Sequence, residues 1–429
     1  MIATLRQRDF SLAWVGGLVS MIGDWVMSIA LPMYVYQLTG SALATSGMFV
    51  ARLLPALILG SVAGVFVDRW DRKRTMVVAN LLLAAALPPL LVVRSADWVW
   101  VVYIVGAAQS VIGQFFQPAE NALLPRLVDD AHLVTANSLN ALNNNLARLL
   151  GPALGGSVMG TFGLSAVVLI DAVSFLFAAA MVALIATSGH VERTSVTATT
   201  ATARSWRRLQ REWQDGIAVI RHNRAVAILV GLRSISYLGE GVMGVIFVVW
   251  VSDVLGGGPR EVGWFMSAQA VGGLAGGLVL GYAGARLSTV QLLGVGSIIF
   301  GLLDLALFNY PRVFSGVWIG LVLIMLVGLP TIGFGAAFAT LLQRTVRDNH
   351  RGRVFGLMGT ISALLMLAGT VIAGILGDAV GPTALLTIQG GSYVLLGVLA
   401  LALLPAALAT TQVGQSSQAA ESGARVRAP

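Results

Sequence analysis

The 429-residue sequence contains no cysteine, and only 11% of its residues are charged. Without cysteine the chain can form neither disulfides nor thiolate metal sites, and it has no thiol nucleophile. A soluble protein usually carries about 25% charged residues. This chain cannot cover its surface with charge, so its composition excludes a protein that is soluble over its whole length, and a disordered chain as well.

Hydrophobic residues make up 57% of the sequence, and its mean hydropathy is +0.83. A helix that crosses the hydrocarbon core of a bilayer needs about 20 apolar residues, and runs of that length recur along the chain. The sequence therefore predicts an all-α polytopic membrane protein with twelve transmembrane helices. We expect these helices near residues 12–37, 44–67, 75–94, 98–118, 135–160, 164–187, 225–251, 261–284, 290–309, 314–342, 353–377 and 383–407.

Basic residues are distributed unevenly between the loops. If the N-terminus lies inside, most of the 27 basic residues fall on that side, and the outer loops hold only Arg94, Arg260 and Arg312. Such an excess of basic residues is typical of cytoplasmic loops. The sequence thus predicts a multi-pass protein of the cell (inner) membrane with both termini in the cytoplasm. The net charge of +8 then reflects topology and contact with the anionic lipid bilayer, and no nucleic-acid partner is expected.

The two halves of the chain repeat each other. At an offset of 218 residues, the segment 123–132 matches the segment 341–350 at six of ten positions, and at an offset of 216 residues 23–27 falls on 239–243. Two six-helix repeats in the same orientation are the plan of certain secondary transporters, which rock about a site between the repeats. The predicted domains are an N-terminal six-helix bundle (1–187), a cytoplasmic linker with an amphipathic helix (188–224), a C-terminal six-helix bundle (225–407) and a disordered cytoplasmic tail (408–429).

Two motifs resemble those of a known family. Residues 64–73 read Gly-Val-Phe-Val-Asp-Arg-Trp-Asp-Arg-Lys, which resembles the Gly-x-x-x-Asp-Arg-x-Gly-Arg-Arg/Lys motif of the major facilitator superfamily, with Asp71 replacing the second glycine. Residues 151–156 match the Gly-Pro-x-x-Gly-Gly motif associated with drug/proton antiporters. Together with Gly-Asp at 23–24 and the sequence at 38–44, they are similar to the macrolide-efflux and enterobactin-exporter branch.

The resemblance implies a cytoplasmic latch and a hinge. The second helix ends at the cytoplasm with its negative end, so Asp68 is better placed beside the start of the eleventh helix, near Arg353. The alternative to the latch is a solvated basic loop that only sets the topology. The alternative to the hinge is ordinary helix packing by the glycines of the fifth helix. The latch motif comprises Gly64, Asp68, Arg69, Asp71, Arg72 and Lys73, and the helix-five hinge motif comprises Gly151, Pro152, Gly155 and Gly156.

Ionisable side chains within the predicted helices mark candidate functional positions. A charged residue at a helix centre costs at least about 2.5–3.5 kcal/mol on insertion, so these groups should face a cavity or one another. Asp24 and Glu240 occupy equivalent positions near the midplane, which predicts a proton- or substrate-coupling pair. Arg148 lies at a depth similar to Asp24, and Arg233 lies two turns from Glu240, so structural salt bridges are the alternative. Weaker candidates are Arg52, Asp171 and Asp304.

These observations favour transport over catalysis. No catalytic residues are proposed, no pair of histidines has metal-ligand spacing, no Walker motif occurs, and no cofactor is expected. Many proton-coupled relatives carry an arginine in the fourth helix. This chain has no arginine there, so Asp24 would have to take a larger part in proton coupling. We predict a monomeric secondary active transporter that exports amphipathic small molecules, of the drug or siderophore type, by alternating access with proton antiport. The alternatives are a facilitator or importer of a lipid or metabolite without antiport, and a membrane-embedded lipid-modifying enzyme.

Overall fold

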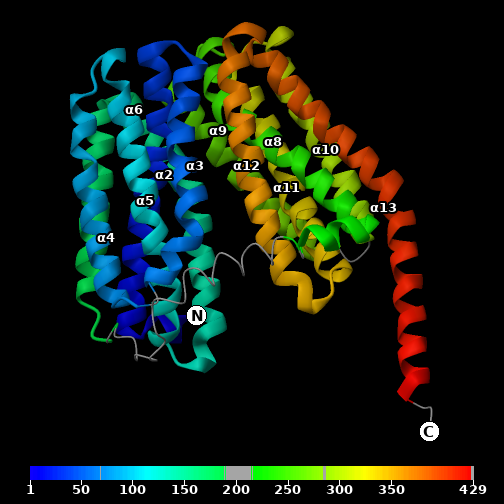
Figure 1. Ribbon diagram of the computed structural model, residues 1–429. Coiled ribbons are helices and arrows are strands. Elements are labelled where there is room, and N and C mark those ends of the chain that lie inside the picture. The colour runs from blue at the N-terminus through cyan, green and yellow to red at the C-terminus, as the bar shows by residue number, and fades with distance from the viewer. Residues whose placement is uncertain (68, 188, 190–213, 215, 284–286, 427–429) are drawn as a thin grey trace.

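The computed structural model describes the whole chain except residues 68, 188, 190–213, 215, 284–286 and 427–429. The described residues form helices joined by short turns, gathered into two bundles that stand side by side (Figure 1). The first bundle contains α1 (Ile2–Leu5), α2 (Arg8–Thr39), α3 (Ala42–Val67), α4 (Arg72–Ala86), α5 (Val99–Leu123) and α6 (Leu133–Ala183). The second contains α8 (Arg224–Asp253), α9 (Pro259–Ala283), α10 (Thr289–Asn309), α11 (Val317–Thr345), α12 (Asp348–Val380) and α13 (Pro382–Val426).

The fold confirms the all-α, membrane-spanning prediction. Within the described residues, eleven helices are long and apolar enough to cross a bilayer. One of them, α6, has 51 residues and is broken at Gly163, whose φ of 74° and ψ of −175° lie outside the helical region. Glycine tolerates this conformation because it has no Cβ. α6 therefore consists of two helices joined end to end at this glycine, and they correspond to the spans expected at 135–160 and 164–187.

Local sequence signals explain where the helices begin and end. α2 ends at Gly40, which has a left-handed conformation (φ 59°, ψ 20°) that terminates helices. The Asn223 side chain accepts hydrogen bonds from the backbone N–H groups of Ala225 and Val226 at the start of α8. Ser288 forms a capping box with Gln291 at the start of α10. Each cap satisfies polar groups that a helix end would otherwise leave unpaired.

Three boundaries differ from the sequence predictions. The third helix was expected at 75–94, but α4 ends at Ala86 and a 3₁₀ turn follows at Pro88–Val92, because consecutive prolines cannot donate helical hydrogen bonds. The fourth helix continues past 118 to Leu123. At the C-terminus α13 runs to Val426, through the residues for which the sequence predicts a disordered tail, and no proline follows Pro405 before that point to stop the helix. Of the predicted amphipathic linker helix, residues 214 and 216–222 are described and helical, and residues 206–213 and 215 lie outside the described residues.

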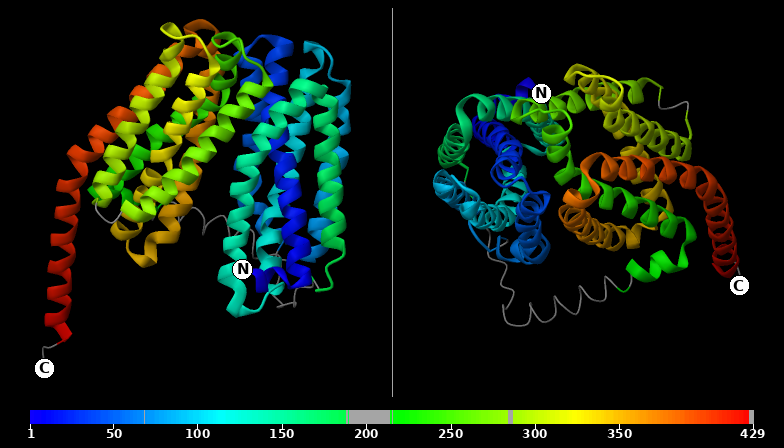
Figure 2. Two further views of the ribbon diagram at one scale, coloured as in Figure 1. Left: turned by 180° about the vertical axis from the view of Figure 1, so that it is seen from behind. Right: turned by 90° about the horizontal axis from the view of Figure 1, so that it is seen from above.

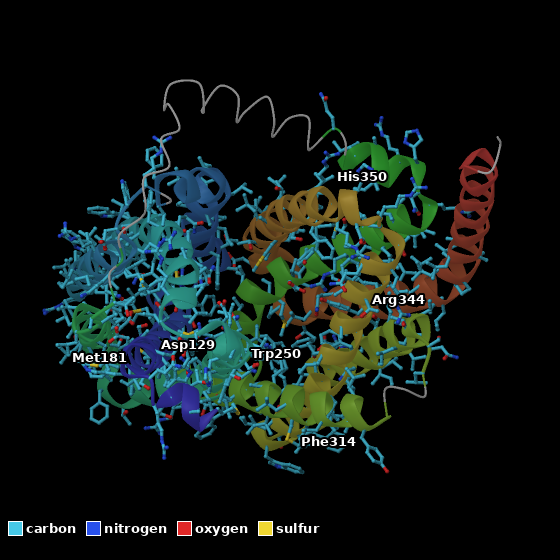
Figure 3. All side chains as sticks on the ribbon, turned by 90° about the horizontal axis from the view of Figure 1, so that it is seen from below. Asp129, Met181, Trp250, Phe314, Arg344 and His350 are labelled. Carbon is cyan, nitrogen blue, oxygen red and sulfur yellow. The ribbon has the colours of Figure 1, made fainter. Side chains whose placement is uncertain are left out.

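The matched repeat segments lie at the same end of the molecule, one in each bundle. Segment 123–132 closes the first bundle where the N-terminus lies, and segment 341–350 closes the second at the same end (Figure 1). Viewed from that end, Asp129 lies in one bundle and Arg344 and His350 lie in the other (Figure 3). The two repeats therefore have the same orientation, as the self-similarity of the sequence requires.

Contacts between the bundles join α6 to α9 and α3 to α12, at the end opposite the N-terminus (Figure 2). Gly156 of α6 lies directly against the Pro259 carbonyl of α9. The Asp378 carboxylate of α12 accepts a hydrogen bond of 3.1 Å from the Ala42 N–H at the start of α3. Tyr36 also donates a 2.5 Å hydrogen bond to Asp253 across the same interface. We call this set of contacts the seam.

The Ser267 hydroxyl of α9 is inserted into the backbone hydrogen bonding of α6. It donates to the Leu149 carbonyl at 2.7 Å and accepts from the Ala153 N–H at 3.1 Å. In a regular helix those two backbone groups, four residues apart, bind each other. Pro152 sits beside them and has no N–H. A side chain of the second bundle thus binds backbone groups of the first bundle beside a proline.

Within each bundle, helices approach closely where glycine replaces a side chain. Gly241 of α8 faces the Met366 carbonyl of α12, and a Cβ at this position would also lie 2.9 Å from the Thr370 nitrogen. Small residues at such contacts permit close van der Waals packing, which drives helix association in lipid. Gly244, one turn further along α8, has no atom within 4 Å of the Cβ position.

Replacing Gly241 by alanine should destabilise the protein, whereas the same change at Gly244 should not. The methyl group of Gly241→Ala would overlap backbone atoms of α12 that cannot move freely. Gly244→Ala gains helix propensity of up to about 1 kcal/mol without a steric clash. We expect a lower midpoint of thermal unfolding in detergent for the first variant and an equal or higher midpoint for the second. Equal midpoints for both variants would contradict this account of the α8–α12 contact.

Candidate functional site

A cavity of about 1070 Å³ lies inside the first bundle and reaches α12 of the second at Met366. It is lined by side chains from α2, α3, α4, α5 and α6, and its wall mixes apolar groups with an unusually large number of polar ones. The polar lining residues are Ser20, Asp24, Arg52, Asn80, Gln109, Ser110, Gln114, Gln117, Glu120, Asn121, Asn137, Asn140, Asn143 and Asn144. A concave site of this size, part apolar and part polar, is typical of small-molecule binding.

Asp24 on α2 is exposed to this cavity, and Asp171 of α6 lies directly behind it. Asp171 is 0% exposed, and neither carboxylate oxygen has a hydrogen-bond partner among the described residues. The two helices meet at Gly23, where a Cβ would lie only 2.6 Å from the Asp171 Oδ1. Glycine at this position brings the buried carboxyl next to the exposed one.

Arg52 of α3 supplies the positive charge at this point of the cavity. It interacts electrostatically with both Asp24 and Asp171. Its side chain passes along α5, where Gly106 leaves room for it, and its carbonyl accepts a 2.6 Å hydrogen bond from Ser110. The fourth transmembrane helix has no arginine of its own, and Arg52 lies against that helix instead.

The structure brings Asp24 together with Arg52 and Asp171, which the sequence ranked as weaker candidates. Arg148 is exposed, does not line the cavity, and has no ion-pair partner in the part of the chain that the structure describes. The predicted alternative of an Asp24–Arg148 pair is therefore not the arrangement seen. The reason is that depth alone does not fix a partner, because Arg148 points to a different side of α6.

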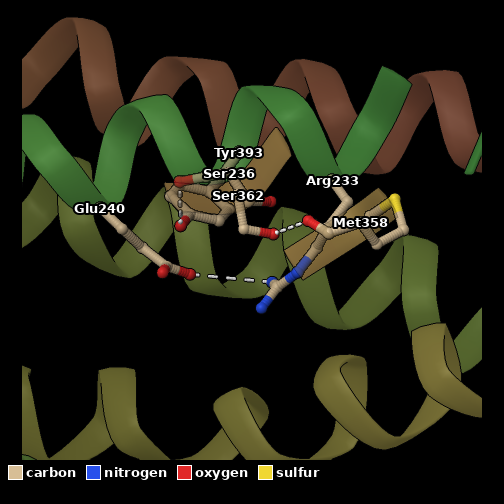
Figure 4. A network of polar contacts seen from close by, with 6 residues as sticks. All are labelled: Arg233, Ser236, Glu240, Met358, Ser362 and Tyr393. Atoms are coloured by element: carbon tan, nitrogen blue, oxygen red, sulfur yellow. Dashed lines mark hydrogen bonds and ion pairs between the residues drawn. The ribbon is translucent and has the colours of Figure 1, made fainter. Parts of the chain in front are cut away.

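In the second bundle, Glu240 and Arg233 form the ion pair that the sequence offered as an alternative (Figure 4). The Arg233 Nη1 and Glu240 Oε1 atoms are 3.7 Å apart, and the side chains are 19% and 40% exposed. The guanidinium also stacks over the Tyr237 ring, 4.3 Å from its centroid. Glu240 thus has a compensating cation on its own helix, two turns away.

Asp304 takes part in a contact within the second bundle. It is 2% exposed on α10 and accepts a 3.4 Å hydrogen bond from the Gln389 Nε2 of α13. Asp304 is not among the residues that line the described cavity. This arrangement agrees with an inter-helix hydrogen-bond acceptor, one of the roles that the sequence suggested for it.

The described members of the latch motif bind backbone groups of the first bundle. Asp71 caps α4 by accepting a 2.9 Å hydrogen bond from the Arg74 N–H. Arg72 donates to the Ala122 carbonyl at the end of α5 at 2.9 Å, and Lys73 donates to the Ile185 carbonyl at 2.6 Å. Cations beside the C-terminal carbonyls of helices are electrostatically favourable. Gly64 lies in α3, Arg69 is exposed, and Asp68 lies outside the described residues.

The helix-five motif divides its contacts between the bundles. Gly151 packs against Trp25, and Gly155 against the backbone of Val26, both on α2 of the same bundle. Pro152 and Gly156 face α9 of the other bundle across the seam. The motif therefore serves packing within the first bundle and closure between the two.

Sequence reasoning missed Glu120 and the amides around it. The fourth helix was expected to end at 118, which left Glu120 outside the membrane, but α5 continues to Leu123. The signal available in the sequence was the asparagine series Asn137, Asn140 and Asn144, whose spacing places all three on one face of α6. Among the described residues no group of three or more His, Asp or Glu side chains could hold a metal ion.

The chain resembles efflux proteins in sequence and membrane transporters in structure. The profile of a family described as transmembrane secretion effector matches residues 1–424. Macrolide efflux protein A of Streptococcus pyogenes is 28% identical, over 87% of this chain and 90% of that protein. The multidrug efflux pump Tap of Mycolicibacterium fortuitum is also 28% identical, over 88% and 91%.

Solved structures share the fold at low sequence identity. A bacterial homologue of the iron transporter ferroportin, in an inward-facing state, has a TM-score of 0.74 and 17% identity, covering 92% of this chain and 98% of that one. The peptide transporter POT has a TM-score of 0.74 and 13% identity, covering 93% and 94%. At these identities the likeness concerns the fold alone.

The geometry predicts different chemical accessibility for the two neighbouring acids. The chain contains no cysteine that could react with a thiol reagent, so single Asp24→Cys and Asp171→Cys variants can be compared directly. We expect a water-soluble maleimide to modify the cysteine at position 24, which faces the cavity, and to leave position 171 unmodified until the protein is denatured. Mass spectrometry of the intact protein gives the labelled fraction. Equal labelling at both positions would contradict the arrangement described here.

Proposed function

We propose that this chain, which belongs to the transmembrane secretion effector family of the major facilitator superfamily, exports amphipathic small molecules across the cell membrane by alternating access coupled to proton antiport. It would act as a monomer, with both termini in the cytoplasm. The sequence similarity to a macrolide efflux protein and a multidrug efflux pump supports export of drug-like molecules.

The observation that carries the proton-coupling proposal is the group of Asp24, Asp171 and Arg52 at the cavity wall. Two carboxyl groups and one guanidinium leave one negative charge uncompensated when both acids are ionised. Uncompensated buried charge is costly, and a bound proton removes that cost. Asp24 is exposed to the cavity, so it can exchange a proton with the solution that fills it.

The shape of the molecule supports alternating access. The bundles contact each other at the seam and diverge toward the end that carries the N-terminus (Figures 1 and 2). With the N-terminus in the cytoplasm, the cavity of this conformation receives substrate from the cytoplasm. Rocking of the bundles would open the seam and close the opposite end, where the loop after α3 would approach the start of α12 as the latch motif implies.

Proton-driven export can be tested with a macrolide and with Asp24→Asn. Cells that produce the protein should accumulate less erythromycin than cells without it, and an uncoupler should abolish the difference. Cells that produce the Asp24→Asn variant should accumulate as much erythromycin as cells without the protein, because an amide cannot carry the proton. Immunoblotting of membranes checks that the variant is present, and Asp97→Asn, at an exposed position outside the cavity, is the matched control.

Two outcomes would contradict this proposal. Uncoupler-resistant equilibration of erythromycin would indicate a facilitator, and an unchanged proton requirement in Asp24→Asn would remove the role given to Asp24. An enzyme is not supported, because the relatives named above are efflux proteins.

Alternating access also predicts that Ser267→Ala weakens the seam. The variant removes two hydrogen bonds between the bundles, of which each is worth about 0.5–1.5 kcal/mol. A loss of about 1 kcal/mol would raise the population that is open at the seam about fivefold. Spin labels on Ser95→Cys and Val313→Cys, one exposed position in a turn of each bundle at the end of the molecule that carries the seam, report the separation of the bundles by pulsed electron paramagnetic resonance.

The control for this experiment is Ser234→Ala. The Ser234 hydroxyl donates to the Val230 carbonyl of its own helix, so its removal leaves the contact between the bundles intact. A distance distribution that is identical in Ser267→Ala and in the unmutated protein would show that the serine does not hold the seam closed.

A further inference from the structure

We propose that the cavity contains a second acid with a separate role, in which Glu120 binds the protonated amine of a cationic amphipathic substrate while the Asp24–Asp171 pair carries the proton. This inference rests on the proposed function and names the substrate class that the cavity selects.

Glu120 projects from α5 into the cavity and is half-buried. A Cβ built on Gly17 of α2 would lie 3.9 Å from both the Glu120 Oε1 and the Asn143 Nδ2, so the two side chains converge beside that glycine. Gly17 precedes Asp24 by seven residues on the same helix, which is two turns or about 10 Å. The two acids therefore lie at different depths of one cavity.

Glu120 differs from Asp24, the other acid that lines the cavity, in having no cation beside it in the described part of the chain. Asp24 interacts with Arg52, and Glu240 is paired with Arg233. The neutral amide of Gln117 donates a hydrogen bond of 3.3 Å to the Glu120 carboxylate. Among the described residues, no cation forms an ion pair with Glu120. A half-buried carboxylate without a protein cation can bind a cation that arrives from outside.

Amides surround Glu120 on two helices. Asn137, Asn140 and Asn144 lie on one face of α6, and Gln114, Gln117 and Asn121 lie on one face of α5. Asn143 is 3% exposed and donates to the Trp14 carbonyl, while its Oδ1 has no hydrogen-bond partner in the described part of the chain. An amide presents both a donor and an acceptor, so these walls suit a ligand with several hydroxyl and carbonyl groups.

Apolar side chains complete the same cavity. Phe49, Phe116 and Phe175 line it together with Met21 and Met366. Methionine and aromatic side chains adapt to bulky apolar ligands of varied shape. The cavity thus offers a carboxylate, amides and apolar side chains. A ligand that matches all three is an amphipathic molecule with one protonated amine, several oxygen functions and a large apolar surface.

The test measures equilibrium binding to the purified full-length protein, which does not depend on proton coupling. The probes are erythromycin, which carries a protonated amine on its amino sugar, and the neutral macrolactone erythronolide B, which lacks that sugar. We expect Glu120→Gln to raise the Kd for erythromycin about tenfold, as loss of a charged hydrogen-bonded contact does, and to leave the Kd for erythronolide B unchanged. Glu120→Asp keeps the charge and should restore much of the affinity.

The separation of the two roles is tested in proteoliposomes with an imposed pH gradient. Glu120→Gln should raise the KM for erythromycin and leave the maximal rate and its dependence on the gradient unchanged, whereas Asp24→Asn should abolish the response to the gradient. Glu261→Gln is the matched control, because it lies outside the cavity and its amide oxygen can still accept from the Gly258 N–H.

Each outcome has one meaning. An equal loss of affinity for both probes in Glu120→Gln would show a structural role, and a lost response to the gradient with unchanged affinity would show that Glu120 carries the proton; either result overturns the inference. If unmutated protein binds erythromycin through Glu120 but shows no gradient-driven transport, the proposed antiport fails while the amine site stands.

Discussion

The cost of a charge in hydrocarbon governs the arrangement of this protein. Each ionisable side chain within the helices must find a counter-charge, a hydrogen bond or water. Asp304 has Gln389, and Glu240 has Arg233. Asp24 and Asp171 share the field of one arginine, Arg52. The acids that remain incompletely compensated are Asp24, Asp171 and Glu120, and all three belong to the first bundle, where Asp24 and Glu120 line the cavity and Asp171 lies behind Asp24. The proposed chemistry of the transporter is therefore concentrated in one half of the repeat.

The asymmetry between the repeats is notable because their backbones are related. Asp24 and Glu240 occupy equivalent positions of α2 and α8. Glu240 is paired within its own helix, whereas Asp24 depends on α3 and α6 for its neighbours. A pair on one helix persists when the bundles rock. A group built from three helices responds to small changes in their packing, which would suit the proposed alternation of this site between two states.

The seam is suited to opening because it relies on backbone contacts and a few hydrogen bonds. Glycine–carbonyl approaches such as Gly156 to Pro259 leave few side chains to disentangle. The interior of the second bundle is different: Trp250 is fully buried and packs edge-on against Phe265 and Phe308. Strong apolar packing inside each bundle and a sparse polar seam between them favour motion of two rigid bodies over deformation of either.

Hydropathy along the chain predicted the twelve spans and the acids within them, because the length and polarity of each segment decide whether it can cross a bilayer. The self-similarity of the sequence predicted the repeat. Which acid meets which cation was decided only by tertiary structure. One residue turns a helix by about 100°, so Arg148 and Arg52 could not be distinguished as partners of Asp24 without the rotation of each helix. The same holds for Ser267, whose role depends on α9 meeting α6 beside Pro152, and for Glu120, which lines the cavity because α5 continues beyond Pro118.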